Sequence, residues 1–164
     1  MAITAITGLY VLVATTTSGG TAPGGSSAPS GCTLTGTTSD ISAFVSQIEV
    51  GADVATQDVT TFGSGGYSAF VAGLRTGQMS MTLFNDYAAS QLNAVVGMNG
   101  TVIPVGSAGV IEVRLTSSAR SSTNPGFVAR IVNTGFRFVN ATVGNAPTVT
   151  WSPVVTGGFA ELTA

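Results

Sequence analysis

Apolar and polar residues alternate with a period of two along most of this chain from residue 41 onward. In segment 78–84 the apolar residues Met79, Met81 and Leu83 share one face, and small hydroxyl residues take the other. Segments 44–50 and 110–116 repeat the pattern. Successive side chains of a β-strand point to opposite faces, so this alternation predicts strands with one face in a core and the other in water.

Nine segments are expected to form strands, and stretches rich in glycine, proline and asparagine separate most of them. They are residues 3–14, 44–50, 58–62, 67–72, 78–84, 101–105, 110–116, 127–138 and 148–156. We expect a turn at 74–77, a bulge or bend at Gly135, and a sheet edge at Pro153, which lacks a backbone N–H. Short strands with regular turns predict an antiparallel sandwich or a small barrel.

One segment departs from the strand period. Asn85 and Asp86 offer a helix N-cap, residues 87–97 place their apolar side chains at helical spacing, and Asn99-Gly100 provides a stop signal. The sequence therefore predicts a mainly β fold of two packed antiparallel sheets, flanked by one α-helix at about 87–97. A length of 164 residues fits a single domain.

A polar stretch at about 15–39 interrupts the pattern, with Leu34 as its one large apolar residue. Thr, Gly, Ser and Pro dominate it, and it holds the single cysteine, Cys32. Loops of this length inside a compact domain are uncommon and are usually functional or flexible. Two interpretations stay open: a flexible linker, or an arm that becomes ordered against a neighbouring subunit.

The charged residues exclude several classes of function. The chain has no His and no Lys, so His-dependent triads, Schiff-base lysines and phosphate-loop lysines are absent. One cysteine makes neither an internal disulfide nor a cysteine-rich metal site. Five arginines against seven acidic residues, a net charge of −2, are a poor footprint for nucleic-acid binding. Only 7% of residues are charged, which indicates a surface that is hidden in an assembly.

A mean hydropathy of +0.46 raises the question of a membrane segment. The longest apolar run near the N-terminus is Leu9–Ala14, whereas a spanning helix needs about 20 apolar residues. Residues 1–8 lack the basic residues of a signal peptide. We expect no membrane insertion by this chain.

Four local patterns have a simple structural interpretation. The glycine-rich Gly63-Ser64-Gly65-Gly66 is expected to be a tight turn rather than a phosphate cradle, because no lysine follows it. Asp53, Thr56 and Asp58 lack the spacing of a calcium loop. The triplet 140–142 fits an N-glycosylation site only in a secreted eukaryotic protein. No pair of carboxylates stands in a recognisable acid–base arrangement, so we expect no catalytic residues, no metal and no cofactor.

The stretch from Asp58 to Tyr87 carries the most specific pattern. It contains a D-V-T-T-F-x-S-G-G-Y turn at 58–67, a strand ending in A-G-L at 72–74, and S-M-T at 80–82. Residues 84–89 then pass from a strand into the expected helix. Later come S-T-N-P-G-F at 122–127 and T-W-S-P-V-V-T-G at 150–157. In this order the motifs resemble the tail tube proteins of long-tailed, non-contractile bacteriophages, over about residues 41–164.

The resemblance implies a structural virion protein without enzymatic activity. Such proteins form hexameric rings in which strands of neighbouring subunits join into one inner barrel. The rings stack into the hollow tail tube that delivers DNA to the host. The implied partners are other copies of the chain, tail terminator and tail tip proteins, and double-stranded DNA that passes without specific binding. The implied location is the virion, with assembly in the host cytoplasm.

A conduit for DNA requires a lumen that does not hold phosphates. An unpaired arginine in the bore would repeat six times in every ring, so we expect the five arginines to lie on the outer face or in paired contacts. They are Arg75, Arg114, Arg120, Arg130 and Arg137. The lumen is expected to carry hydroxyls, amides and carboxylates, with Glu49 and Asp58 as the candidate acids. The turn Gly63-Ser64-Gly65-Gly66 is the candidate subunit contact.

Two alternatives remain at this point. One is another β-rich assembly protein, such as a capsid decoration protein or a surface fibre subunit. The other is a secreted carbohydrate-binding sandwich, which requires an exposed aromatic platform. The single tryptophan, Trp151, lies in a strand that resembles core.

Overall fold

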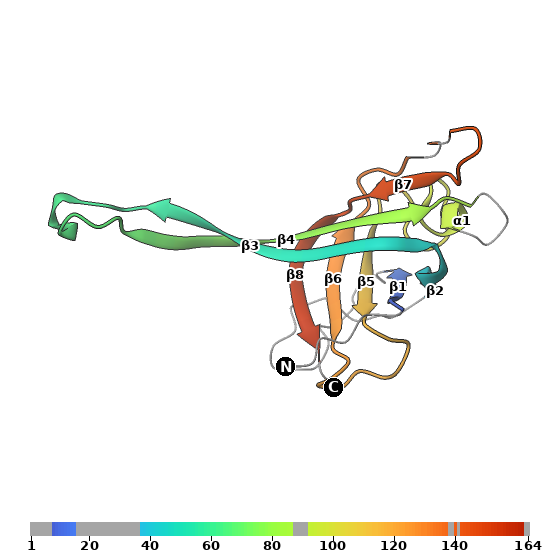
Figure 1. Cartoon of the computed structure of the whole chain (residues 1–164), viewed down its shortest axis with the longest axis horizontal. Helices are drawn as coiled ribbons and strands as arrows, with labels where there is room; N and C mark the ends of the chain where they lie inside the picture. The colour runs from blue at the N-terminus through green and yellow to red at the C-terminus, as the bar shows by residue number, and fades with distance from the viewer. Residues whose placement is uncertain (1–7, 16–36, 87–91, 138–139, 141, 163–164) are drawn as a thin grey trace.

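Two antiparallel sheets make up the body of the protein. The computed structural model describes residues 8–15, 37–86, 92–137, 140 and 142–162 (Figure 1). Strands β1 (Tyr10–Thr15), β2 (Thr38–Asp40), β5 (Ala108–Arg114), β6 (Gly126–Val132) and β8 (Val154–Leu162) form one sheet, in the order β2-β1-β5-β6-β8. Strands β3 (Val45–Asp58), β4 (Phe70–Phe84) and β7 (Thr148–Trp151) form the other, in the order β3-β4-β7. Two short 3₁₀ helices, η1 (Ser42–Phe44) and η2 (Phe62–Ser64), and one α-helix, α1 (Leu92–Val96), complete the described elements.

The core fills the space between the two sheets. Met79, Met81 and Leu83 of β4 are buried in it together with Ile111 of β5 and Trp151 of β7. The intervening residues of β4 face the other side, so the alternation predicts the buried face of this strand correctly. The expected fold of two packed antiparallel sheets with one flanking helix is confirmed.

Strands β3 and β4 form a hairpin that projects far beyond the body (Figure 1). The predicted strand at 58–62 is wrong, because β3 ends at Asp58 and η2 begins at Phe62. The predicted turn at 74–77 is also wrong, because one continuous strand runs from Phe70 to Phe84 and includes the second half of the strand predicted at 67–72. Gly77, in the predicted turn, and Gly73, just before it, serve close packing instead. A Cβ on Gly73 would lie 3.1 Å from the Ala55 carbonyl oxygen, and a Cβ on Gly77 would lie 2.7 Å from Val155 Cγ1.

Pro153 marks the point where the chain changes sheets. The sequence predicted one strand over 148–156 with Pro153 at a sheet edge. The structure divides this segment into β7 and β8, which belong to different sheets, so the single strand is wrong. Each of the two is an edge strand of its sheet, so the predicted edge is confirmed. Proline has no N–H to donate to a ladder, so Ser152 and Pro153 interrupt the pairing here. The last strand thus ties the two sheets together covalently.

Three further predictions differ from the structure. Residues 101–105 form no strand, because the amides of Thr101, Val102 and Ile103 bond instead to carbonyls of α1. The strand predicted at 127–138 ends at Val132, before Gly135. The expected loop at 15–39 includes the short strand β2 at its end. Residues 1–7, 16–36 and 87–91, which hold parts of the first strand, the polar arm and the helix as predicted, lie outside the described residues.

A buried amide joins the last turn of α1 to both sheets. The Asn133 side chain donates to the carbonyl oxygens of Val96 and Ile103, at 2.9 and 2.8 Å, and accepts from Trp151 Nε1 at 3.0 Å. Asn133 and Trp151 are fully buried. Because all three polar groups are satisfied in a dry interior, the network fixes how the elements meet.

Replacing Asn133 by Ala is expected to lower the free energy of unfolding by at least about 3 kcal/mol. The substitution leaves two carbonyls and one indole N–H buried without partners, at about 1–3 kcal/mol for each such group. Urea unfolding followed by the fluorescence of the single tryptophan measures the change. Asn99→Ala, at an exposed position of the turn after α1, is the matched control and should change stability by less than about 0.5 kcal/mol. Equal stabilities of the two variants would contradict this role for Asn133.

Candidate functional site

The three-stranded sheet presents a polar face to solvent, on the side opposite the core. Register places Glu49 of β3 opposite Ser80 of β4, Gly51 opposite Gln78, and Asp53 opposite Thr76. Thr82 of β4 pairs with Thr150 of β7 on the same face. These positions carry hydroxyls, amides and carboxylates, and no arginine of β3, β4 or β7 shares this face.

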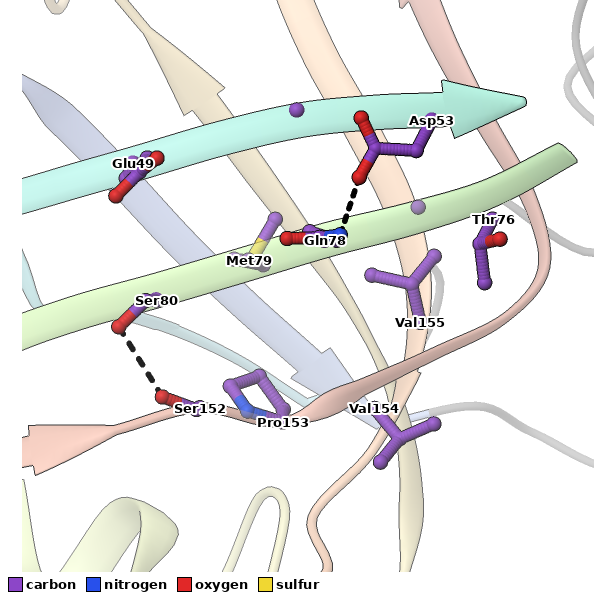
Figure 2. A pocket seen from close by; sticks show the side chains of 12 residues that line it. Glu49, Asp53, Thr76, Gln78, Met79, Ser80, Ser152, Pro153, Val154 and Val155 are labelled. Carbon is purple, nitrogen blue, oxygen red and sulfur yellow. Dashed lines mark hydrogen bonds between the residues drawn. The ribbon is translucent and has the colours of Figure 1, made fainter. Parts of the chain in front are cut away.

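An open groove of about 460 Å³ lies on this face where β4 and the chain after β7 diverge. Figure 2 shows Glu49 and Asp53 on β3, Gln78 and Ser80 on β4, and Ser152 beyond them. The amide of Gln78 donates to Asp53, and the Ser80 and Ser152 hydroxyls lie 3.1 Å apart. Glu49 is exposed, and no hydrogen bond or ion pair joins its side chain to another described residue, so its carboxylate faces solvent.

The other lateral edge of this sheet carries a cation. Arg137 lines a second groove, of about 520 Å³, together with Thr134, Phe136, Thr150 and Ser152. The side chain of Asn140 donates to the Thr148 carbonyl at 2.9 Å, so the segment after β6 runs beside β7. Arg137 is exposed and has no ion-pair partner among the described residues.

Of the other four arginines, two contact the carboxylate of Glu112 and two are exposed. Arg120 donates Nε and Nη2 to the buried Glu112 at 2.7 and 2.8 Å, and Arg114 Nε lies 3.3 Å from the same carboxylate. The hydrogen bonds that Arg120 donates to Glu112 raise the pKa of Arg120 above its usual value. Arg75 and Arg130 are exposed, and no ion pair to the described residues involves them. The expectation that all five lie outside a bore or in paired contacts therefore stays a prediction.

The hairpin beyond the body exposes an unusual amount of apolar surface. Leu74 exposes 85% and Tyr67 81% of its surface, and other large apolar side chains of the hairpin lie in solvent with them. The full set is Val54, Val59, Phe62, Tyr67, Phe70, Val71 and Leu74. Contiguous exposed apolar surface on a soluble chain usually marks a contact with another macromolecule.

The predicted turn Gly63-Ser64-Gly65-Gly66 forms the tip of this hairpin. Gly65 and Gly66 have φ of 63° and 86°, in the left-handed region that favours glycine. The tip also holds a groove of about 380 Å³ beside Phe62 and Tyr67. The turn thus lies at the end of the hairpin, far from the core (Figure 1), and its role as a subunit contact stays a prediction.

Asp58 closes the hairpin just before the tip. Its carboxylate accepts the Thr60 N–H at 2.8 Å and the Thr60 hydroxyl, and the Thr60 hydroxyl oxygen accepts the Ala69 N–H at 2.9 Å. These hydrogen bonds from Thr60 lower the pKa of Asp58. Nine residues of strand separate Asp58 from Glu49, about 30 Å at ~3.3 Å per residue, so the structure does not bring the two candidate acids together.

The other sequence patterns form no binding or metal site in the described part of the chain. Asp53 and Asp58 are separated along β3 and each is hydrogen-bonded locally, and no group of three or more metal-ligating side chains gathers among the described residues. Trp151 is fully buried, so it offers no platform to a carbohydrate. Cys32 lies outside the described residues. None of the described helices has the length and apolar character that crossing a bilayer requires.

Comparison with known proteins gives one informative result. No protein-family model and no curated protein matches this chain. A solved chain from the "Virion of native gene transfer agent (GTA) particle" matches with a TM-score of 0.52 and 13% identity, over 73% of this chain and 85% of that chain. The two chains share a fold. The likeness covers most of the virion chain, so the arrangement of elements, rather than a local motif, is what the two have in common.

Sequence reasoning missed two parts of this site. The projecting hairpin was missed because residues 74–77 were interpreted as a turn. Six of the large apolar residues that it exposes lie between residues 59 and 74, among few charges, and that composition was the available signal. The position of Arg137 beside β7 depends on tertiary structure and left no signal in the sequence.

Asp58→Ala is expected to loosen the tip without affecting the core. The amides of Thr60 and Ala69 should lose protection from hydrogen exchange, while the free energy of global unfolding stays unchanged. Folding lowers the pKa of Asp58. The stabilisation of the tip by the Asp58 carboxylate is therefore present above the unfolded pKa of about 3.9 and is lost as pH falls through the folded pKa. Protection factors of these two amides in the wild type should therefore fall below about pH 4, and those of the variant should not. Identical protection in both proteins would contradict this role.

Proposed function

We propose that this chain is a structural virion protein, a tail tube subunit, rather than an enzyme. In this proposal six copies form a ring, rings stack into a hollow tube, and double-stranded DNA passes through the tube into the host. The partners are further copies of the chain and, at the tube ends, tail terminator and tail tip proteins. The protein acts in the virion after assembly in the host cytoplasm.

The observation that carries the proposal is the β3–β4 hairpin. Its outer part extends beyond the body and exposes seven large apolar side chains, which a lone subunit leaves in water. Full burial of one such side chain contributes about 1.5–3 kcal/mol, so a second copy that covers the hairpin supplies a large driving force for assembly. The shared fold with a chain of a virion particle supports the same conclusion.

The strand edges of the three-stranded sheet support lateral assembly. Among the described strands, β3 pairs only with β4, and β4 pairs with β7 only over residues 81–84. The edge of β3 and the outer part of β4 therefore keep unpaired backbone groups. Such edges promote aggregation in a monomer, whereas pairing with neighbours in a closed ring removes them.

The polar face of the same sheet has the chemistry of a DNA conduit. We assign it to the lumen, with Glu49 and Asp53 as its acids, because its hydroxyls, amides and carboxylates offer no cation to phosphates. Asp58 belongs to the hairpin contact in this assignment, and not to the bore at the level of Glu49. A weakly acidic lining lets the polymer slide, since the net field on it is mildly repulsive.

The alternative of a decoration protein or fibre subunit also fits exposed apolar surface. Negative-stain microscopy of the purified protein separates them, because only the tail tube proposal requires six-fold rings or tubes of constant diameter with a hollow centre. Compact particles without a central hole would contradict the proposal. With five basic and seven acidic residues per subunit, the tubes should also persist at about 0.5 M salt, where exposed charges are largely screened.

Replacing Phe70 and Leu74 together by Ser is expected to prevent ring and tube formation and to leave the monomer folded. Both side chains are exposed on the outer part of the hairpin, so they contribute to contacts between copies and not to the core. Sedimentation velocity measures the assembled fraction, and thermal unfolding measures the fold. Val143→Ser, at an equally exposed apolar position outside the hairpin, is the matched control and should assemble as the wild type does. Normal assembly of the double variant would rule out the hairpin as the main contact.

A further inference from the structure

The two lateral edges of the three-stranded sheet carry opposite charge. Glu49 and Asp53 lie on β3, at one edge, and Arg137 lies beside β7, at the other. The positions between them on the polar face of β4 and β7 are uncharged: Thr76, Gln78, Ser80, Thr82, Phe84, Thr148 and Thr150. The face is therefore acidic at one side and basic at the other.

These charges have no ionic partner within the described part of the subunit. Glu49 makes no described polar contact, and Asp53 is bound by an uncharged amide of Gln78. The ion pairs of the described residues all use Glu112, which lies on the other sheet. Two strand spacings, about 10 Å, separate the backbones of β3 and β7, and Arg137 lies beside β7, so the sheet itself keeps the two charges apart.

We infer that Arg137 of one copy pairs with Glu49 and Asp53 of the next copy around the ring. This inference rests on the proposed ring assembly and adds the residues that set its lateral register. A contact between two different edges is heterologous, and repeating it by rotation closes a ring. Opposite charges at such edges favour this order of edges and disfavour placing two like edges together.

The pairing also accounts for the one exposed arginine beside the polar face. Arg75 pairs in register with Val54 and so points to the opposite face of the hairpin, and Arg130 lies on β6 of the other sheet. Arg137 alone among the described exposed arginines borders the proposed lumen. Contact with two carboxylates of the neighbour would neutralise it, so that it does not hold a phosphate of the passing DNA.

The ion pairs between Arg137 and the two carboxylates of the next copy set the register and specificity of the contact more than they strengthen the tube. Exposed ion pairs contribute little to stability, and salt screens them. Placing like charges together instead opposes docking at all six contacts of a ring. Charge reversal therefore gives a sharper test than charge removal.

The test uses two full-length variants that reverse the charge of one edge each. The acidic variant is Arg137→Glu, and the basic variant is Glu49→Arg with Asp53→Arg. At low salt each variant alone should show at least a tenfold lower fraction of rings than the wild type, because like-charged edges meet at every contact. An equimolar mixture should recover rings, because acidic and basic subunits alternate, and a six-membered ring accommodates this order. Sedimentation velocity and negative-stain microscopy give the two readouts.

Arg130→Glu is the matched control, because it makes the same charge change at an exposed position away from this sheet. It should assemble as the wild type does. Recovery in the mixture also shows that both variants are folded. Normal assembly of Arg137→Glu alone, or folded variants that fail to recover rings when mixed, would overturn the inference. Absence of rings from the wild type would instead overturn the proposed function, so the two failures are distinguishable.

Discussion

The β3–β4 hairpin extends well beyond the core that supports it, and the rest of the structure depends on this constraint. Near its root, β4 packs against β8, and Gly77 leaves room for Val155 where a Cβ would lie 2.7 Å from that side chain. Beyond this contact no other described element covers the hairpin as a second layer, yet it keeps apolar residues such as Phe70 and Leu74. A two-stranded ribbon is marginally stable in water by itself, so the sequence of the hairpin is suited to a covered environment. Coverage by other copies of the chain follows from this constraint.

The body holds the root of the hairpin in a fixed position. The chain crosses from one sheet to the other at Pro153, and the Asn133–Trp151 network joins β6, β7 and α1 through buried hydrogen bonds. On the other sheet Glu112 gathers two arginines and so removes two of the five cations from the surface available to partners. The result is a rigid base with one polar face, one projecting apolar element and few exposed charges.

Local pattern was enough to predict the fold class, because alternation reports which face of each strand is buried. It correctly placed Met79, Met81 and Leu83 in the core, and it placed the described helix inside the predicted range. It failed where tertiary contacts decide the outcome. Residues 74–77 were expected to form a turn, but Gly77 serves close packing within β4. Pro153 lies between two edge strands of different sheets rather than within one strand, and the amides of residues 101–103 bond to α1. Of the candidate site, the tip turn and the solvent-facing Glu49 were predictable, whereas Asp58 acts in a local cap and Arg137 is brought to β7 only by the fold.

The central claim is that the polar face of the three-stranded sheet lines a bore. Electron cryomicroscopy of the assembled protein, at a resolution that traces the chain, tests it most directly. The account predicts six subunits around a hollow centre, with Glu49 facing the lumen, the hairpin covered by a neighbouring copy, and the five-stranded sheet on the outside. A ring with the five-stranded sheet toward the centre, or a filament without a bore, would contradict it.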